Sequence, residues 1–229
     1  MRVKRLLEQV HSPMRATKRE LRAPDMKAQS ISDAVAISTA LTGDGLVQLL
    51  FSLEQLTIDL LFEGYFIRGA VVKGKLYHDN KMVFGEALVD AINLEHEVVR
   101  FPRVMIHSAV VKDAFNDNNW LDDFKNRILR ADDGPYFLHA LYDMERRVQS
   151  EREKHGEDVD AEYSGELTYF AEVRNKIQQR FQEATDNPRH FEKVQWFAKY
   201  WNTTVETLNV DGLGKIVGPG LEQPAGRWD

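Results

Sequence analysis

The sequence predicts an α+β fold in which helices cover one face of an antiparallel sheet and a helical extension follows. Between residues 27 and 108, β-favouring runs alternate with segments whose apolar residues recur at helical spacing. Beyond about residue 144 the pattern is helical only. With 229 residues and 43% hydrophobic composition, the chain can bury a substantial core.

The first elements are a helix and a hairpin. Residues 2–22 are predicted to be helical, with a break at Ser12-Pro13. Residues 27–39 favour extended chain, but the carboxylate of Asp33 stands among apolar neighbours, where burial is costly. A hairpin resolves this conflict, with strands at 27–31 and 34–39 and Ser32-Asp33 at the tip. There Asp33 either binds a cation or completes an Asx turn.

The next elements complete the predicted sheet layer. A long helix at about 46–63 follows a Gly-rich turn, and residues 65–84 are predicted to form a hairpin around His78-Asp79-Asn80. Residues 85–99 have helical periodicity, and residues 103–108 form a strand after Pro102. This order is most of a ferredoxin-like layer.

The carboxy-terminal part is predicted to be mainly helical. A small hairpin is expected at 127–142, followed by a charged run at 144–160 that is a solvated linker or an exposed helix. Two further helices are expected at 162–184 and 188–206. The second carries an aromatic stripe, which we interpret first as core packing and only second as a binding face. The stripe consists of Trp196, Phe197, Tyr200 and Trp201.

Composition excludes several classes of function. The net charge of −6 disfavours nucleic-acid binding, although residues 1–30 carry eight Lys or Arg against three acids, as either a solvated helix face or a phosphate-facing surface. The absence of cysteine excludes disulfides and thiol catalysis. The apolar window Leu46–Phe62 contains Glu54 and Asp59 and is shorter than a bilayer span. We therefore expect a cytoplasmic protein that binds neither nucleic acid nor membrane.

Two other kinds of site are not expected. The histidines are scattered without the ligand spacing of a zinc site. The sequence also lacks the Gly-x-Ser-x-Gly turn of a serine hydrolase.

A set of short motifs follows one another in a fixed order along the chain. The set consists of Ser32-Asp33, Arg68-Gly69, Gly74, Phe84-Gly85, Ala87-Leu88, Leu94-Glu95 and Pro102-Arg103. In this order it resembles the class III nucleotidyl cyclases, and most closely the pyrimidine (uridylate or cytidylate) cyclases of the Pycsar anti-phage systems. The resemblance covers about residues 28–107 well and 187–205 loosely.

The resemblance implies an enzyme that makes a second messenger in antiviral defence. The 3′-hydroxyl of UTP or CTP attacks the α-phosphate and pyrophosphate leaves, giving a 3′,5′-cyclic pyrimidine mononucleotide. In the family two aspartates hold two Mg²⁺ or Mn²⁺ ions between the protomers of a homodimer, and Asp33 matches the second aspartate. Residues 1–142 then form the catalytic domain, 143–206 a helical extension and 207–229 a tail.

Other positions depart from the family pattern of the purine cyclases. Their transition-state Asn and Arg fall on Val89 and Asn93, and their base-reading Lys and Asp fall on Gln29 and Met82. We predict that Gln29 hydrogen-bonds a pyrimidine edge, or is only a surface residue. Ser32, Met82, Asn93 and Arg103 complete the candidate nucleotide site. Arg100 and Arg103 are the candidates to replace the transition-state arginine, or Arg103 only packs or pairs within the fold.

The family's first metal aspartate ends a strand that precedes the opening helix, and residues 1–26 hold no such turn. We therefore expect the first strand of the fold to be missing and the chain starting at Met1 to be inactive or nearly so. The leading interpretation remains a pyrimidine cyclase. The alternative is a catalytically silent cyclase-fold module that binds a nucleotide or a partner.

Overall fold

The computed structural model describes residues 26–31, 34–116, 125–157, 159–161, 164–165 and 167–221. Two parts of the prediction lie outside these residues, namely the helix at 2–22 and the hairpin tip at Ser32-Asp33.

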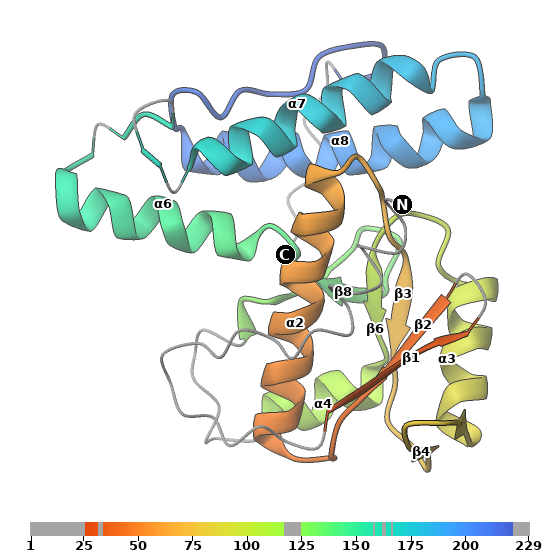
Figure 1. Ribbon diagram of the computed structural model, residues 1–229. Coiled ribbons are helices and arrows are strands. Elements are labelled where there is room, and N and C mark those ends of the chain that lie inside the picture. The colour runs from red at the N-terminus through yellow and green to blue at the C-terminus, as the bar shows by residue number, and fades with distance from the viewer. Residues whose placement is uncertain are drawn as a thin grey trace.

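The architecture is α+β, with a sheet layer on which a layer of helices lies (Figure 1). The strands are β1 (Lys27–Ile31), β2 (Ala34–Ser38), β3 (Gly69–Val71), β4 (Tyr77–His78), β5 (Val83–Phe84), β6 (Val104–Ile106), β7 (Ile128–Arg130) and β8 (Tyr136–Leu138). The helices are α2 (Gly43–Phe62), α3 (Glu86–Glu97), α4 (Ser108–Asn116), α6 (Tyr142–His155), α7 (Thr168–Glu183) and α8 (Pro188–Leu208).

The strands form one mixed sheet and two hairpins. The four-stranded sheet has the order β3-β6-β8-β7, in which β3 and β6 are parallel and the other pairs are antiparallel. The prediction of a wholly antiparallel sheet is therefore wrong. The connection from β3 to β6 passes through α3, and such a crossover returns the chain in the same direction.

The predicted hairpin at 65–84 is also shorter than expected. Only Tyr77–His78 and Val83–Phe84 pair with each other, as β4 and β5. The earlier part of that segment becomes β3 and joins the central sheet, where Val71 is buried. Burial of an apolar strand in the main sheet therefore overrides the local hairpin pattern.

Several helices agree with the sequence prediction, and one was not predicted. The bounds of α2, α3 and α8 agree with the predicted helices to within about three residues, and the charged run at 144–160 is largely the helix α6. The helix α4 was missed because it follows β6 directly, without a Gly or Pro boundary. Its buried residues Val110, Val111 and Ala114 recur at helical spacing and face the sheet core.

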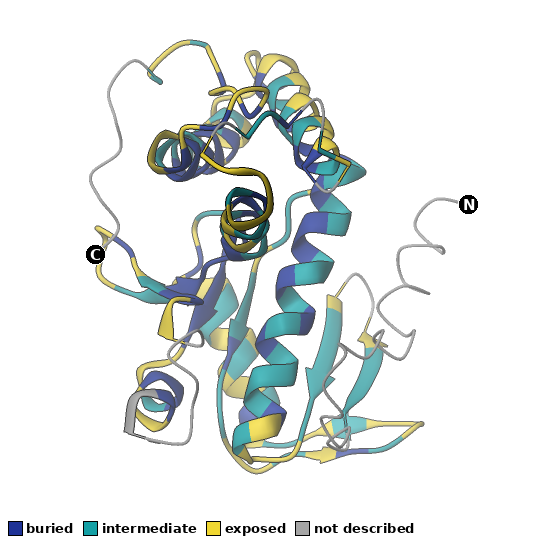
Figure 2. Cartoon of the chain, turned by 90° about the vertical axis from the view of Figure 1, so that its left-hand side faces the viewer, coloured by how far each residue is buried: buried dark blue, intermediate teal, exposed yellow. Residues whose placement is uncertain are grey.

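Two hydrophobic clusters meet along α2, which crosses from the sheet layer to the helical layer (Figure 2). Leu50 packs with β3, β6 and α4, whereas Ile58 and Leu61 pack with α7 and α8 in the larger cluster. The helix α6 begins at Tyr142, and the division of the chain into domains near this residue stays a prediction. Because α2 contributes to both clusters, the helical layer packs directly on the sheet layer.

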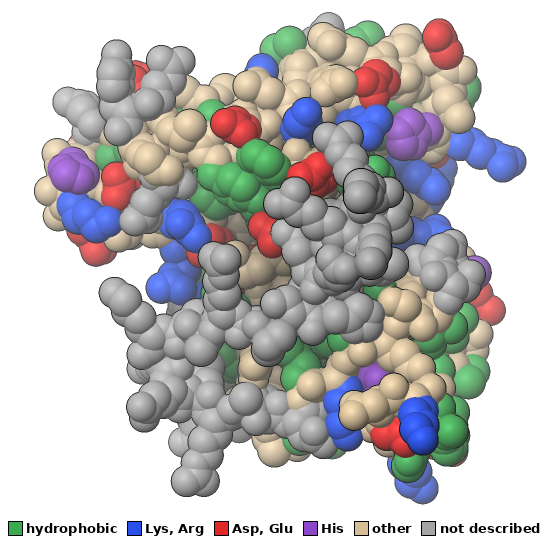
Figure 3. Space-filling model, in the orientation of Figure 1, with side chains coloured by type: hydrophobic (Ala, Val, Ile, Leu, Met, Phe, Trp, Pro, Cys, Tyr) green, Lys and Arg blue, Asp and Glu red, His purple; other side chains and the backbone are tan. Residues whose placement is uncertain are grey.

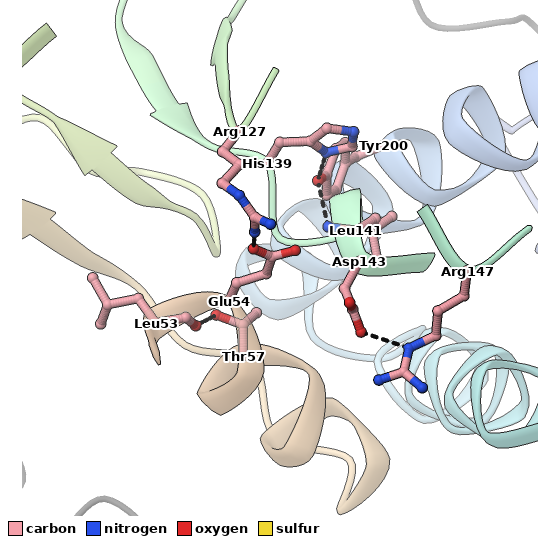
Figure 4. A network of polar contacts seen from close by, with 9 residues as sticks. All are labelled: Leu53, Glu54, Thr57, Arg127, His139, Leu141, Asp143, Arg147 and Tyr200. Atoms are coloured by element: carbon pink, nitrogen blue, oxygen red, sulfur yellow. Dashed lines mark hydrogen bonds and ion pairs between the residues drawn. The ribbon is translucent and has the colours of Figure 1, made fainter. Parts of the chain in front are cut away.

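By length and composition alone α2 could cross a membrane. In the folded chain, however, it carries buried Glu54, which pairs with Arg127 just before β7 (Figure 4). Asp59 accepts a hydrogen bond of 3.0 Å from Tyr169 on α7. These polar contacts and the packing of Leu50 are those of a core helix.

A second buried polar chain ties β8 to α8 (Figure 4). The Tyr200 hydroxyl accepts from the Leu141 amide at 3.2 Å and lies 2.6 Å from Nδ1 of His139, whose Nε2 is 3.0 Å from Glu145. The Tyr200 hydroxyl and the His139 ring thus join the Leu141 amide to the Glu145 carboxylate in one chain of polar contacts. Burial raises the pKa of Tyr200 well above its ordinary value. The aromatic stripe of α8 therefore lies in the core, as its first interpretation predicted.

Candidate functional site

The candidate site is built on the β1–β2 hairpin. Small and β-branched residues favour extended chain here, and the register pairs Ile31 with Ala34 and Gln29 with Ala36. The two strands of the predicted hairpin are thus confirmed, with Ser32 and Asp33 as the two residues that connect them. The roles of these two residues remain predictions.

Two hydrogen bonds hold this hairpin against the β4–β5 hairpin. The side-chain amide of Gln29 donates to the Lys81 carbonyl at 2.9 Å, and the Ser38 hydroxyl lies 2.7 Å from Nδ1 of His78. Met82 follows Lys81 directly and is 49% exposed. The structure thus brings together Gln29 and Met82, two positions that the sequence analysis assigned to base recognition and that lie 53 residues apart in the sequence.

Asp79 organises the loop that carries Lys81 and Met82. One carboxylate oxygen accepts from the Lys81 amide at 2.7 Å and the Met82 amide at 2.9 Å, and the other accepts from the Tyr77 hydroxyl at 2.8 Å. The two backbone hydrogen bonds are the main reason that the pKa of Asp79 is lowered, whereas donation to Asp79 raises the pKa of Tyr77. The loop conformation therefore depends on an ionised Asp79.

Gly85 joins β5 to α3 through a close backbone approach. Its φ is 142°, and a Cβ at this position would lie 2.5 Å from the Lys75 carbonyl oxygen. A Cβ at Gly74 would lie 3.2 Å from Cβ of Ala87 in the first turn of α3. These glycines allow α3 to pack closely beside the loop between β3 and β4.

The other end of α3 is held by an ion pair. Arg68, which precedes β3, pairs with Glu95 and also donates to the Val99 carbonyl at 3.3 Å. Gly74 with Ala87, and Arg68 with Glu95, are two pairs of motif residues that the folded chain brings into proximity.

A group of exposed hydrophobic residues, here called the apolar edge, lies beside this region. Ala87 is the one buried residue of α3, and the hydrophobic residues Val89 and Ile92 are 55% and 45% exposed. On the β4–β5 hairpin the rings of Tyr77 and Phe84 stack at 5.0 Å and remain about half exposed. Hydrophobic side chains accordingly gather over β4 and α3 at the lower right of Figure 3. The apolar edge consists of Tyr77, Met82, Phe84, Val89 and Ile92.

Asn93 lies one turn after Val89 on α3 and is exposed. Positions four residues apart share a helix face, so Asn93 borders the apolar edge. A polar side chain there can hydrogen-bond a ligand or a partner that covers this face.

Arg103 has a different position from the other candidates. Its guanidinium forms two hydrogen bonds of 2.8 and 2.6 Å with Asp133, and its side chain is only 2% exposed. It also lies 5.3 Å from the ring centroid of Trp196. This arrangement fits packing and pairing within the fold, the second of the two interpretations considered for Arg103. Arg100 pairs with Glu192 at 2.5 Å and is otherwise exposed.

The described residues contain no group of three His, Asp or Glu side chains that could hold a metal ion. Asp33 lies outside them. The donor set for Mg²⁺ or Mn²⁺ is therefore not assembled by the part of the chain that the structure describes, and no chemical step is derived through a metal ion.

Sequence analysis missed the contacts that order the site. From the sequence, Asp79 was assigned only to a turn. An Asp whose carboxylate accepts hydrogen bonds from the amides two and three residues later is nevertheless a known turn signal. The pairing of Gln29 with Lys81 carries no local signal, because it joins two hairpins across the fold. The partner of Glu54 was equally hidden, although an acid within an apolar helix indicates that some buried partner exists.

Comparisons with models of protein families, with curated proteins and with solved structures found no significant match for this chain.

Proposed function

We propose that this protein is a pyrimidine nucleotide cyclase, which converts UTP or CTP to the 3′,5′-cyclic mononucleotide and pyrophosphate as a signal in antiviral defence. The observation that carries the proposal is the contact between Gln29 and the loop of Lys81 and Met82. These are the two positions at which purine cyclases read the base, and they lie together within one chain. The ferredoxin-like class III cyclase fold belongs to the same proposal.

The direction of the Gln29 amide bears on the base. Its nitrogen donates to the Lys81 carbonyl, so the oxygen is the atom left to accept a hydrogen bond. This oxygen is enclosed and has no hydrogen-bond partner among the described residues. The proposal therefore requires that this oxygen is uncovered when a nucleotide binds. An acceptor then matches the amino group of cytosine or the N3–H of uracil, and the neighbouring Met82 supplies an apolar contact. Both pyrimidines therefore remain substrates of the proposal.

Asp33 is assigned to a Mg²⁺ or Mn²⁺ ion on the strength of the resemblance. A carboxylate supplies the hard oxygen ligand that these ions prefer. When bound, the ions neutralise charge on the phosphates. Ser32 and Asn93 are assigned to the same nucleotide site, and Arg103 is left out because its guanidinium is engaged by Asp133.

We further propose a homodimer in which the partner covers the apolar edge. Five hydrophobic side chains that are about half exposed on one hairpin and one helix are typical of an interaction surface. An interface here lies beside Gln29 and Asn93, so a nucleotide bound there can contact both protomers.

A catalytically silent module that binds nucleotide or a partner is the second candidate. One observation favours it: among the described strands, β2 pairs only with β1, and β3 pairs only with β6. Each therefore has one edge at which a further strand, such as the one that carries the family's first metal aspartate, can pair.

The test measures binding and turnover on the full chain. UTP, CTP, ATP and GTP are each supplied with Mn²⁺, cyclic products are detected by mass spectrometry, and nucleotide binding is measured by calorimetry. Turnover of a pyrimidine nucleotide supports the enzyme, and Mn²⁺-dependent binding without turnover supports the silent module. If the chain shows neither turnover nor binding, both proposals are wrong.

The role of Asp33 is tested by Asp33→Ala. This variant should lose Mn²⁺-dependent binding or turnover while its thermal midpoint and oligomeric state stay unchanged. Asp132→Ala is the matched control, because Asp132 is an exposed carboxylate beyond β7. Unchanged activity in Asp33→Ala contradicts the metal assignment, and loss of folding supports a structural turn instead.

A further inference from the structure

The segment after α8 runs back along α7 and α8 without regular secondary structure (Figure 1). Six of the side chains that contact it are here called the α7–α8 seam. The side chains of the seam are Arg174, Gln178, Phe181, Gln195, Trp201 and Asn202.

Two amide side chains of the seam each form a pair of hydrogen bonds with the backbone of one of two consecutive residues. Asn202 on α8 accepts from the Ile216 amide at 2.6 Å and donates to its carbonyl at 2.9 Å. Gln178 on α7 does the same for Val217, with both distances at 2.9 Å. In an extended chain the amide and carbonyl of one residue point to the same edge, and those of the next residue point to the other edge. The backbone groups on the two edges of this extended segment are therefore hydrogen-bonded by α8 and by α7.

Further contacts continue this pattern along the segment. The indole of Trp201 donates to the Gly214 carbonyl at 3.2 Å, Arg174 to the Lys215 carbonyl at 2.7 Å, and Gln195 to the Pro219 carbonyl at 3.1 Å. Arg174 and Gln178 are four residues apart, so they lie on one face of α7. The seam thus binds the extended segment through hydrogen bonds to its backbone.

Side chains of the segment add selectivity. Ile216 is 1% exposed and Leu213 is 3% exposed, whereas Val217 points outward and is 65% exposed. A Cβ at Gly218 would lie 2.4 Å from the Phe181 ring, at a φ of 152°. The seam therefore favours large aliphatic side chains at the first two positions and glycine at the third.

We propose that the α7–α8 seam is a binding site for an extended peptide, which residues 213–219 of this chain occupy in cis as a resident ligand. Hydrogen bonds from seam side chains to backbone atoms are independent of the peptide's outward side chains, so another segment with the same aliphatic and glycine positions can replace the resident one. A partner protein that carries such a segment is the ligand that this surface fits.

The test uses the full chain with its own segment weakened by Ile216→Ser and Gly218→Val. The probe is a fluorescent peptide of residues 210–221, and binding is followed by anisotropy. The peptide should bind the weakened chain at least ~10-fold more tightly than the unsubstituted chain, because there the tethered segment competes at a high effective concentration. Circular dichroism and thermal melting establish that the weakened chain is folded.

Two controls define the specificity of binding. Adding Gln178→Ala and Asn202→Ala to the weakened chain should reduce peptide affinity at least ~10-fold, since four hydrogen bonds are lost. Gln179→Ala, whose side chain instead pairs with Glu183, should have no effect. A peptide with Gly218→Val should not bind. Absence of binding to a folded weakened chain overturns the proposal and makes the segment a fixed part of the fold.

Hydrogen exchange on the unsubstituted chain gives a second measurement that requires no destabilised variant. If the segment is exchangeable, the amides of Ile216 and Val217 should exchange by local opening, faster than the amides of Phe197 and Val205 within α8. Exchange of all four amides only through global unfolding contradicts the proposal.

Discussion

In the helical layer of α6, α7 and α8, large side chains such as Phe170 and Phe181 are almost fully buried, whereas in the apolar edge Phe84 and Val89 are more than half exposed. The two regions have similar kinds of side chain and differ in what covers them. The helical layer completes its core within one chain, with α2 inserted into it. The apolar edge has its polar loop satisfied by Asp79, but its hydrophobic side chains stay about half exposed. The difference separates the part of the molecule that provides stability from the part that we propose as an interaction surface.

The largest expected effect comes from removing the same ring in each region. Phe170→Ala in the helical layer should lower the free energy of unfolding by about 3–5 kcal/mol, because a buried aromatic ring is lost and a cavity remains. Phe84→Ala in the apolar edge should change it by less than about 0.5 kcal/mol in the monomer, because that ring is exposed. Urea denaturation at low protein concentration measures both. Equal losses would erase the distinction between the two regions.

The buried ion pair next to the helical layer gives a second large effect. Glu54→Leu leaves the guanidinium of Arg127 buried between Phe51 and Tyr142 without its carboxylate, which should cost about 3 kcal/mol or more. The double variant Glu54→Leu with Arg127→Met removes both charges and should recover most of this loss. A double variant that is as unstable as the single one would show that the pair itself, and not the unpaired charge, stabilises the fold.

A smaller effect is expected at the glycine that positions the apolar edge. Gly85→Ala should destabilise the chain by about 1–3 kcal/mol, because the residue has a positive φ and approaches the Lys75 carbonyl. Gly134 also has a positive φ, of 102°, but a Cβ there meets nothing within 4 Å. Gly134→Ala should therefore cost less, and thermal melting compares the two. If the two variants melt alike, backbone strain alone accounts for Gly85.

The smallest effect is a local dependence on pH. The folded-state pKa of Asp79 is lowered, so its carboxylate stabilises the β4–β5 loop above the ordinary pKa of Asp, and this contribution is lost as pH falls through the lowered value. NMR shifts of the Lys81 and Met82 amides should therefore change at acid pH while α8 stays unaffected. In Asp79→Asn this titration should disappear. A titration that persists would belong to another group.

Much of the secondary structure could be predicted from local patterns. The periodicity of α2 and α8, the strands of the β1–β2 hairpin and the β7–β8 hairpin around Gly134 were all placed from sequence. The parallel pairing of β3 with β6 was not, because strand pairing over 35 residues leaves no trace in the local sequence. The helix α4 was missed for a different, local reason, because no Gly or Pro separates it from β6.

The candidate site was predictable only in part. Gln29 and Met82 could be named from the resemblance, and folding through two hairpins brings them together. The burial of Arg103 against Asp133 and Trp196 could not be foreseen, because Asp133 belongs to a turn 30 residues later and Trp196 to the last helix.

By itself the sequence determined which segments are helical or extended, because side-chain periodicity and turn residues act over a few positions. It also placed an acid, Glu54, within the apolar α2 helix. Only the tertiary structure decided which residue pairs with it, which hydrophobic residues stay exposed on α3, and which amides hold the segment after α8. These outcomes depend on contacts between residues far apart in the chain, where packing and burial, rather than local preference, set the free energy.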